Sequence, residues 1–425
     1  MKLKLADLNI TELENVAIEY GQPKFRGAQM LRWVGRGAVS FDDMTDLPKS
    51  FREEMSENYE TGIPAIINKL HSKRDDTVKY VFATFDGNVI EGVQMRYKHG
   101  VTACISSQAG CRMGCRFCAS KPPGFSRNLS SGEMLGQVVA INRDLRVAAP
   151  ASAAPANITA VVAAPASAAH TDITSIGAAP GSAAPANITA VVAAPASAAH
   201  TDITSVGVAP ASAAPANITA VVAAPAANVP GRQISNIVVM GIGEPFDNYS
   251  NCLGFIKLLH ENPEIGIGYR KVTISTCGVL PGIERLADEG LPIGLSVSLN
   301  APNDEIRNTL MPVNKKYCID ELLDVCSIYT KKTGRRVTFE YAMIDGVNDK
   351  DVHAREIAVK LRKILCHVNL IPINRVEGSG FRPSDRTRID RFEGILRNGG
   401  VNVTVRRVLG TDIMAACGQL RLLQK

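Results

Sequence analysis

The sequence lacks any stretch that is long and apolar enough to span a lipid bilayer. It also begins without the apolar core and small-residue cleavage site that mark a secretory signal peptide. We therefore expect a cytoplasmic protein that does not associate with membranes. In a reducing cytosol, its ten cysteines are more often metal ligands or catalytic thiols than parts of a disulfide framework.

The segment from Ser152 to Ala226 lacks lysine, arginine and aromatic residues altogether. Units of 15 residues, which read SAAPANITAVVAAPA or begin SAAHTDITS, alternate through it. A fixed period can indicate a solenoid, but units without large side chains could bury little surface, so a mobile or loosely extended segment is equally consistent. We interpret residues 147–227 as an Ala/Pro-rich, low-complexity repeat insert.

The rest of the chain has the composition of a globular protein. Hydrophobic residues make up 45% of the 425 residues, which is enough for two or three domains. All 47 basic residues and all but two of the 41 acidic residues lie outside the repeats. The net charge of +6 suits a polyanionic partner, although charge alone does not identify one.

The first 100 residues predict a helical region followed by a hairpin. Thr11 with Glu14 predicts a capping box, and two further helices are expected over residues 24–37 and from Lys49. We expect a small helical domain over residues 1–60. Period-two alternation on both sides of Asp86-Gly87 predicts a β-hairpin within residues 61–100.

From residue 101 onward, apolar strand patterns alternate with helical patterns six times, with the insert between the first helix and the second strand. This alternation predicts an α/β fold with a parallel, barrel-like sheet over residues 101–146 and 228–425. In such folds the chemistry lies at the carboxyl ends of the strands. The insert enters at the opposite ends, so we expect it to be remote from the active site.

Three cysteines follow the first of these strands with the spacing C-x3-C-x2-C, namely Cys111, Cys115 and Cys118. A structural zinc site uses four ligands. Cys104 could be a fourth, but it lies on the strand whereas the others share a loop. An iron–sulfur cluster held by only three thiolates leaves one iron open to a substrate or cofactor. For the spacing alone, a zinc knuckle and chance thiols are alternatives.

In the first βα loop of a six-unit barrel, with Phe117 before its last cysteine, this motif resembles the radical S-adenosylmethionine (SAM) superfamily. The resemblance implies a partial (β/α)6 radical SAM barrel, a [4Fe-4S] cluster held by the three cysteines, and SAM bound to the open iron and cleaved to a 5′-deoxyadenosyl radical. Small or polar residues also end the other strands, as in GIGEP, STCG, SLN and IPIN. By resemblance, the SAM contacts are Gly243, Glu244, Ser275, Ser298, Leu299, Asn300 and Asn374.

Longer stretches, among them MGIGEP, FEYAMIDGVND, VNLIPIN and VTVRRVLGTDIMAACGQL, are similar to the RlmN-type RNA adenine methyltransferases and their Cfr-type relatives. The N-terminal GQPKFRGAQMLRWV is similar to the same family, which implies an RNA-docking role for the helical domain. The resemblance also implies that Cys417 takes a methyl group from one SAM and that a second SAM activates it. Cys104 would then form a transient disulfide with Cys417 that releases the base, and Glu91 would be the proton acceptor.

The resemblance implies that carbon 2 of an adenine in 23S rRNA and in tRNAs is methylated, with a reductase such as flavodoxin or ferredoxin and a monomeric enzyme. A Cfr-type carbon 8 methyltransferase is the nearest alternative, and a noncatalytic zinc-knuckle RNA-binding protein is an alternative of another class. Asn300 stands where the family more often has His. The pairs Arg335-Arg336 and Arg406-Arg407 can neutralise phosphates. The remaining cysteines are expected to fill core or surface positions: Cys252, Cys277, Cys318, Cys326 and Cys366.

Overall fold

The computed structural model describes residues 2–120, 124–148, 234–374, 376 and 379–420, together with four short strands within residues 174–221. The chain divides into two compact units, Met1–Val147 with Val229–Lys425, and Ala148–Asn228.

In the second unit, residues 28 to 31 positions apart pair with each other. The strand β9 (Thr174–Gly177) is parallel to β11 (Ser205–Gly207), and β10 (Val191–Val192) is antiparallel to β12 (Ala220–Val221). The predictions for the conformation of the rest of the insert, and for its distance from the active site, lie outside the described residues.

Three helices follow one another near the N-terminus, as predicted: α1 (Ile10–Glu19), α2 (Phe25–Arg36) and α3 (Lys49–Asn58). The predicted capping box was wrong by two residues. Asn9 Oδ1 accepts a hydrogen bond from the Glu12 N–H at 3.0 Å, and Glu12 Oε2 accepts one from the Asn9 N–H at 2.8 Å. Asn is among the best N-cap residues, so Thr11 lies inside the first turn instead of capping it.

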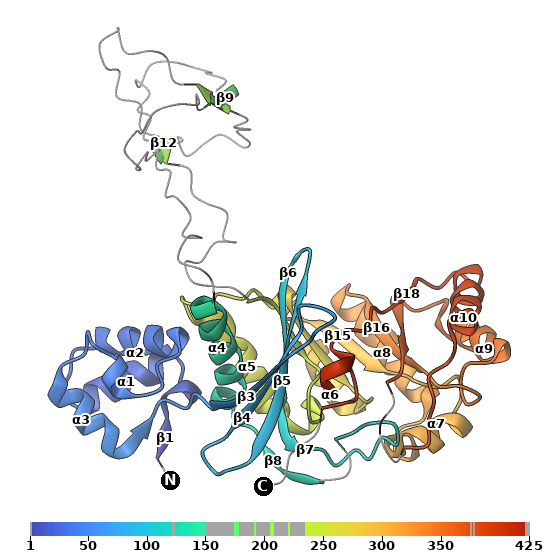
Figure 1. The fold of residues 1–425 in the computed structure, drawn as a ribbon, viewed down its shortest axis with the longest axis horizontal. Coiled ribbons are helices and arrows are strands. Elements are labelled where there is room, and N and C mark those ends of the chain that lie inside the picture. The colour runs from blue at the N-terminus through green and yellow to red at the C-terminus, as the bar shows by residue number, and fades with distance from the viewer. Residues whose placement is uncertain are drawn as a thin grey trace. The chain divides into compact units, whose positions relative to one another are not determined.

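A ten-stranded sheet has the order β18-β17-β16-β15-β14-β13-β6-β5-β4-β3 (Figure 1). Every pairing from β6 to β18 is parallel, and every pairing from β3 to β6 is antiparallel. The hairpin predicted around Asp86-Gly87 is confirmed as β4–β5. The strands are β3 (Ala65–His71), β4 (Val78–Ala83), β5 (Val89–Tyr97), β6 (Gly100–Cys104), β13 (Ile234–Val239), β14 (Val272–Thr276), β15 (Gly294–Ser298), β16 (Val337–Met343), β17 (Cys366–Pro372) and β18 (Val403–Val405).

A helix follows each of the six predicted strands, so the six βα units are confirmed. Ser130 caps the first of these helices as expected, because Ser130 Oγ accepts from the Glu133 N–H at 3.2 Å and Glu133 Oε2 accepts from the Ser130 N–H at 3.0 Å. The shorter α7 (Asp304–Leu310) lies in the connection after β15. The six helices are α4 (Ser131–Ala148), α5 (Tyr249–Glu261), α6 (Leu280–Asp288), α8 (Ile319–Thr333), α9 (Asp351–Leu361) and α10 (Arg386–Asn398).

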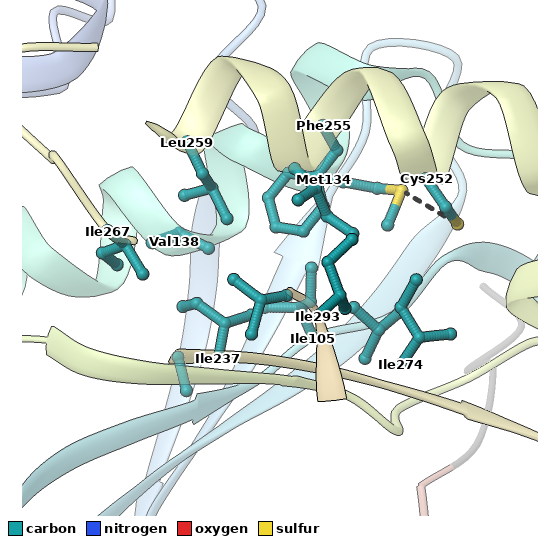
Figure 2. Packing of buried hydrophobic residues seen from close by; sticks show 14 of the residues in the cluster. Ile105, Met134, Val138, Ile237, Cys252, Phe255, Leu259, Ile267, Ile274 and Ile293 are labelled. Atoms are coloured by element: carbon teal, nitrogen blue, oxygen red, sulfur yellow. Dashed lines mark hydrogen bonds between the residues drawn. The ribbon is translucent and has the colours of Figure 1, made fainter. Parts of the chain in front are cut away.

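Apolar side chains fix the helices to the sheet. Figure 2 shows Met134 of α4 and Phe255 of α5 above Ile237 and Ile274 of the strands, all of them almost fully buried. Burying a side chain of this size contributes about 1.5–3 kcal/mol. This packing fixes each strand, and therefore the position of the loop that leaves its carboxyl end.

Candidate active site

The motif cysteines lie on a loop that is closed by a short hairpin. β7 (Gln108–Gly110) pairs antiparallel with β8 (Phe125–Asn128), and the intervening chain carries all three cysteines. Gly110 has a φ of +82°, and a Cβ at this position would lie 1.9 Å from the carbonyl oxygen of Gly124. Only glycine fits at this close approach, so the hairpin depends on it to hold the loop.

The three motif thiols, Cys111, Cys115 and Cys118, line one cavity of about 1050 Å³ that is open to solvent. Among the described residues, no three His, Cys, Asp or Glu side chains are grouped closely enough to hold one metal ion. Three thiols around one cavity fit a [4Fe-4S] cluster, in which each thiolate binds a different iron.

Burial raises the pKa of the Cys111 thiol to about 11 and also raises that of Cys115. Both thiols are therefore protonated at neutral pH in the absence of a cation. A bound metal centre deprotonates its thiol ligands outright. Because the pKa values of these thiols are raised, the thiols lose their protons only when the metal centre binds.

The strand-end residues predicted to contact SAM line the same cavity, with one exception. Leu299 is 2% exposed, and its N–H donates to the carbonyl oxygen of Glu340 at 3.0 Å instead of facing the cavity with its side chain. The others converge from the ends of four strands onto the space beside the three thiols: Gly243, Glu244, Ser275, Ser298, Asn300 and Asn374.

Glu244 is a buried carboxylate, not a solvated turn residue, with an exposed fraction of 2%. Its oxygens accept hydrogen bonds from the Cys277 N–H at 2.7 Å and the Phe246 N–H at 3.0 Å. Burial raises the pKa of Glu244, while these hydrogen bonds act in the opposite direction. The carboxyl group is thus fixed in orientation at the cavity wall, where it can accept a further hydrogen bond from an ammonium group.

Asn300 adopts a left-handed backbone conformation with a φ of 57°. Asn tolerates this region better than most residues. Its Oδ1 accepts from the Ala342 N–H at 2.8 Å, and its Nδ2 lies 3.3 Å from Met311 Sδ. The amide therefore ties the end of β15 to β16 and holds an ordered turn at the cavity.

Arg307 of α7 was not predicted as a site residue, yet it organises two of the predicted loops. It is fully buried, and its guanidinium donates to the carbonyl oxygens of Cys277, Ser298 and Leu299 at 2.7–3.1 Å. A fourth bond of 2.9 Å reaches Asn314 Oδ1. No local pattern marks this arginine in the sequence, because its partners lie on strand ends that only the folded sheet brings together.

A second cavity of about 740 Å³ is lined by two thiols from outside the motif, Cys104 at the end of β6 and Cys417 near the C-terminus. Cys118 also lines it, and Cys417 lines both cavities. Burial raises the pKa of Cys104 to about 12, and the nearby Cys417 adds to this rise. The structure thus brings together thiols that are more than 300 positions apart in the sequence.

Arg406 lies where the two cavities meet, since it lines both. Its Nη1 is 3.8 Å from Glu340 Oε2, and the proximity of Cys417 raises its pKa. Arg407 is exposed and lines only the cavity of the two thiols. The pair Arg335-Arg336 lines neither cavity, and Arg335 Nε instead donates to the carbonyl oxygen of Ile293.

Glu91 lies on β5, two residues before Val93, which lines the cavity of the two thiols together with Met95 and Tyr97. Alternate residues of a strand share a face, so Glu91 is on the cavity face of β5, although it does not itself line either cavity. It is 1% exposed and forms an ion pair of 3.0 Å with Lys79 Nζ.

The remaining cysteines fill the core with two exceptions. Cys252, Cys326 and Cys366 are buried among apolar residues. Cys318 is half-buried at the N-cap of α8. Cys277 was expected in the same group, but it follows β14 and lines the motif cavity, where its backbone binds both Glu244 and Arg307.

Two family models match this chain. The Radical SAM superfamily matches residues 224–356, and the ribosomal RNA large subunit methyltransferase N-terminal domain matches residues 3–61. A probable dual-specificity RNA methyltransferase RlmN of Alkaliphilus oremlandii (strain OhILAs) is 40% identical over 421 residues, which cover 99% of this chain and 98% of the relative. The chain belongs to the RlmN family of radical SAM RNA methyltransferases.

A second RlmN relative and a solved structure are similar to this chain over nearly its whole length. The Clostridium tetani (strain Massachusetts / E88) protein of the same description is 38% identical over 419 residues, covering 99% of this chain and 96% of its own length. A solved radical SAM methyltransferase from Sphaerobacter thermophilus has a TM-score of 0.77 and 37% identity, and the match covers 98% of this chain and 99% of that one.

Membership of the RlmN family confirms the predicted partial radical SAM barrel, with a [4Fe-4S] cluster and SAM as cofactors and RNA as the substrate class. Family membership also shows that the protein is an enzyme, so the alternative of a noncatalytic zinc-knuckle protein was wrong. No helix among the described residues has the length and apolar character needed to cross a membrane.

Proposed function

We propose that this enzyme methylates carbon 2 of an adenine in 23S rRNA and in tRNAs, through S-methylation of Cys417 and a transient disulfide with Cys104. The observation that carries the proposal is the cavity shared by Cys104, Cys118 and Cys417, which adjoins the cavity of the motif thiols. The match of residues 3–61 to a large-subunit rRNA methyltransferase domain and the dual-specificity description of the relatives support both classes of RNA.

Cys111, Cys115 and Cys118 hold the cluster, and Gly243, Glu244, Ser275, Ser298, Leu299, Asn300 and Asn374 hold SAM, with Leu299 contributing through its backbone. When bound, the cluster supplies the electron that cleaves SAM to a 5′-deoxyadenosyl radical. The buried Glu244 carboxylate accepts a hydrogen bond from the amino group of SAM. Arg307 maintains the turns that present Ser298 and the neighbouring residues.

Cys417 is the nucleophile. Its thiolate attacks the methyl carbon of SAM, so a carbon–sulfur bond forms on Cys417 and S-adenosylhomocysteine leaves. Cys417 lines both cavities, so its sulfur can react with SAM in the cavity of the motif thiols and with the RNA base in the cavity that contains Cys104.

Cys104 resolves the covalent intermediate. The 5′-deoxyadenosyl radical takes a hydrogen atom from the S-methyl group of Cys417, and the resulting carbon joins carbon 2 of the adenine. Cys104 then loses its proton and attacks the Cys417 sulfur, so the disulfide forms as the bond between that sulfur and the carbon breaks. The carbon takes up a proton and stays on the adenine as the methyl group, and the bound cluster would take back the one electron that this step releases. The pKa of about 12 keeps Cys104 protonated until this step, so Cys104 does not compete with Cys417 for the methyl group.

Glu91 is the proposed acceptor of the proton at carbon 2. Its carboxylate pairs with Lys79 Nζ at 3.0 Å, and its place on the cavity face of β5 supports this role. Glu91→Gln is expected to abolish methylation of the RNA, whereas the earlier methylation of Cys417 should still occur.

The adenine must leave its stack to reach these thiols. The N-terminal helices dock the RNA, and Arg406-Arg407 neutralise its phosphates at the cavity. A flavodoxin or ferredoxin supplies electrons, and the enzyme acts as a monomer in the cytoplasm.

Nucleoside mass spectrometry of RNA from a strain that lacks this gene tests the proposal. Restoring the wild type should bring back 2-methyladenosine in 23S rRNA and tRNA, whereas Cys417→Ala should not. Appearance of 8-methyladenosine instead would contradict the proposal and favour the carbon 8 reaction.

A further inference from the structure

The segment that carries Cys417 is attached to the protein at both ends. On its N-terminal side, residues 410–412 contact the turn between β3 and β4. On its C-terminal side, residues 418–420 contact the loop of the motif cysteines. Cys417 lies between these attachments and is the exposed residue of its immediate stretch, whereas Ala415 and Ala416 are buried.

Two aspartates make the N-terminal attachment, one on the segment and one on the turn, and each accepts hydrogen bonds from the other side. Asp412 on the segment accepts from Ser72 Oγ and from the Lys73 N–H, both at 2.8 Å. Asp75 on the turn accepts from the Gly410 N–H at 3.0 Å. Each partner thus supplies a carboxylate to the other's donors, and we call Asp75 and Asp412 the aspartate clasp. Hydrogen bonds to ionised acceptors are roughly twice as strong as neutral ones.

Backbone contacts make the C-terminal attachment. The Ala119 N–H donates to the Gly418 carbonyl oxygen at 2.7 Å, and Ser120 Oγ donates to that of Leu420 at 2.7 Å. Ala119 and Ser120 follow Cys118 directly, so this end of the segment moves with the cluster loop.

The clasp links the Cys417 segment to the sheet that carries Cys104. Cys104 ends β6, and β6, β5, β4 and β3 are consecutive neighbours in one sheet. The turn that holds Asp412 joins β3 to β4 of this sheet. Leu409 and Ala415 of the segment also pack in one apolar cluster with Cys104, and the clasp adds directional hydrogen bonds to this non-directional contact. Releasing the clasp would leave Cys417 near Cys104 but with a variable approach to it.

We propose that Asp412 and Asp75 are positioning residues that set the Cys417 sulfur opposite Cys104 for formation of the disulfide. This inference rests on the proposed function, because it concerns the two-thiol step. The two residues line neither cavity, and they act through the segment that carries Cys417.

Thiol–disulfide equilibrium in glutathione buffers measures this positioning without any methylation reaction. In the exchange, Cys104 and Cys417 lose two protons and two electrons to oxidised glutathione, which yields one protein disulfide and two molecules of reduced glutathione. The cluster-loaded full chain is equilibrated under anaerobic conditions, and the Cys104–Cys417 peptide is quantified by mass spectrometry. Asp412→Ala should lower the equilibrium constant about tenfold, because a segment released from the turn holds Cys417 opposite Cys104 for a smaller fraction of the time and so lowers its effective concentration there.

Asp412→Asn retains one acceptor oxygen and should fall between the wild type and Asp412→Ala, and Asp75→Asn should behave in the same way. Asp76→Ala is the matched control. Asp76 is the exposed acidic neighbour in the same turn, and among the hydrogen bonds of the described residues it contributes its backbone carbonyl. It should stay within about twofold of the wild type.

An Asp412→Ala constant equal to that of the wild type, or an equal loss in Asp76→Ala, would overturn the aspartate clasp. The melting temperature separates a positioning effect from a folding effect. A clasp variant should lower the thiol–disulfide equilibrium constant and keep the melting temperature of the wild type. If the wild type itself forms no Cys104–Cys417 disulfide, the proposed function fails first, and that result differs from a failure of the clasp alone.

Discussion

Replacing Arg307 by Met should destabilise the protein and weaken SAM binding together. Met has nearly the length of arginine and none of its donors. The substitution leaves the carbonyl oxygens of Cys277, Ser298 and Leu299 without the guanidinium, in a place where Arg307 is fully buried. Two of these carbonyls belong to residues that line the cavity of the motif thiols.

The magnitude follows from the buried hydrogen bonds. One hydrogen bond to a charged group contributes about 1.5–3 kcal/mol, but bonds made by one side chain are not additive. Leaving one buried acceptor without its donor costs about 1–3 kcal/mol, and Arg307→Met leaves several acceptors unpaired. We therefore expect Arg307→Met to lower the free energy of unfolding by about 3–5 kcal/mol, and the loosened turns to weaken SAM binding about tenfold.

Urea unfolding followed by circular dichroism measures the first effect, and calorimetric titration of the reconstituted protein with SAM measures the second. Fluorescence of the single tryptophan is a poorer probe, because Trp33 lies in α2, away from the sheet. The matched control is Arg388→Met on α10, where the arginine is exposed, and it should stay within about 0.5 kcal/mol of the wild type. A loss below about 1 kcal/mol for Arg307→Met, similar to the control, would refute the assignment of Arg307 as the organiser of these turns.

Three further outcomes are expected. Asn300→Ala should cost about 2–4 kcal/mol in urea unfolding, since it places a residue without a polar side chain at a φ of 57° and unpairs the Ala342 N–H; a neutral effect would show that this turn is not held by the amide. Deleting Ser152 to Ala226 should leave cluster binding and RNA methylation intact, since loop closure depends only weakly on length; loss of both in a folded deletion protein, measured by iron content and nucleoside analysis, would contradict this. Burial opposes the shift, but hydrogen bonds from Arg127 and Lys4 hold the pKa of Glu133 below its ordinary value of 4.5. The stabilisation is therefore fully present above pH 4.5 and is lost as the pH falls below that value through the lower folded pKa. Glu133→Gln should flatten the decline in urea stability below pH 4.5, and an unchanged decline would show that Glu133 does not cause it.

The parallel part of the fold was predictable from the sequence because buried parallel strands read as short apolar runs. The strands β13 to β17 all show such runs, and a helical pattern follows each of them. β3 escaped prediction since it is an edge strand with mostly exposed residues, among them Lys69, and shows no clear alternation. The cap of α1 was misplaced because Asn9 and Thr11 are both good N-cap residues and both have a Glu three residues later, so pattern alone chose wrongly.

The site was predictable only where a local motif or a family resemblance marked it. The cysteine spacing and the small residues at strand ends gave the cavity of the motif thiols. Arg307 and the aspartate clasp could not be predicted, because their hydrogen bonds join residues that are distant in the sequence: Asp412 is bound by Ser72, which is 340 positions away. The burial of Glu91 against Lys79 likewise depends on strand pairing.

The central claim is that Cys104 resolves a covalent bond between Cys417 and the RNA, and Cys104→Ala tests it most directly. Incubated with SAM, a reductant and substrate RNA, this variant should accumulate an RNA–protein adduct. Mass spectrometry should place the link, through one carbon, on the peptide that contains Cys417, and Cys104→Ala combined with Cys417→Ala should give none. Release of methylated RNA by Cys104→Ala at the wild-type rate, with no adduct, would contradict the account.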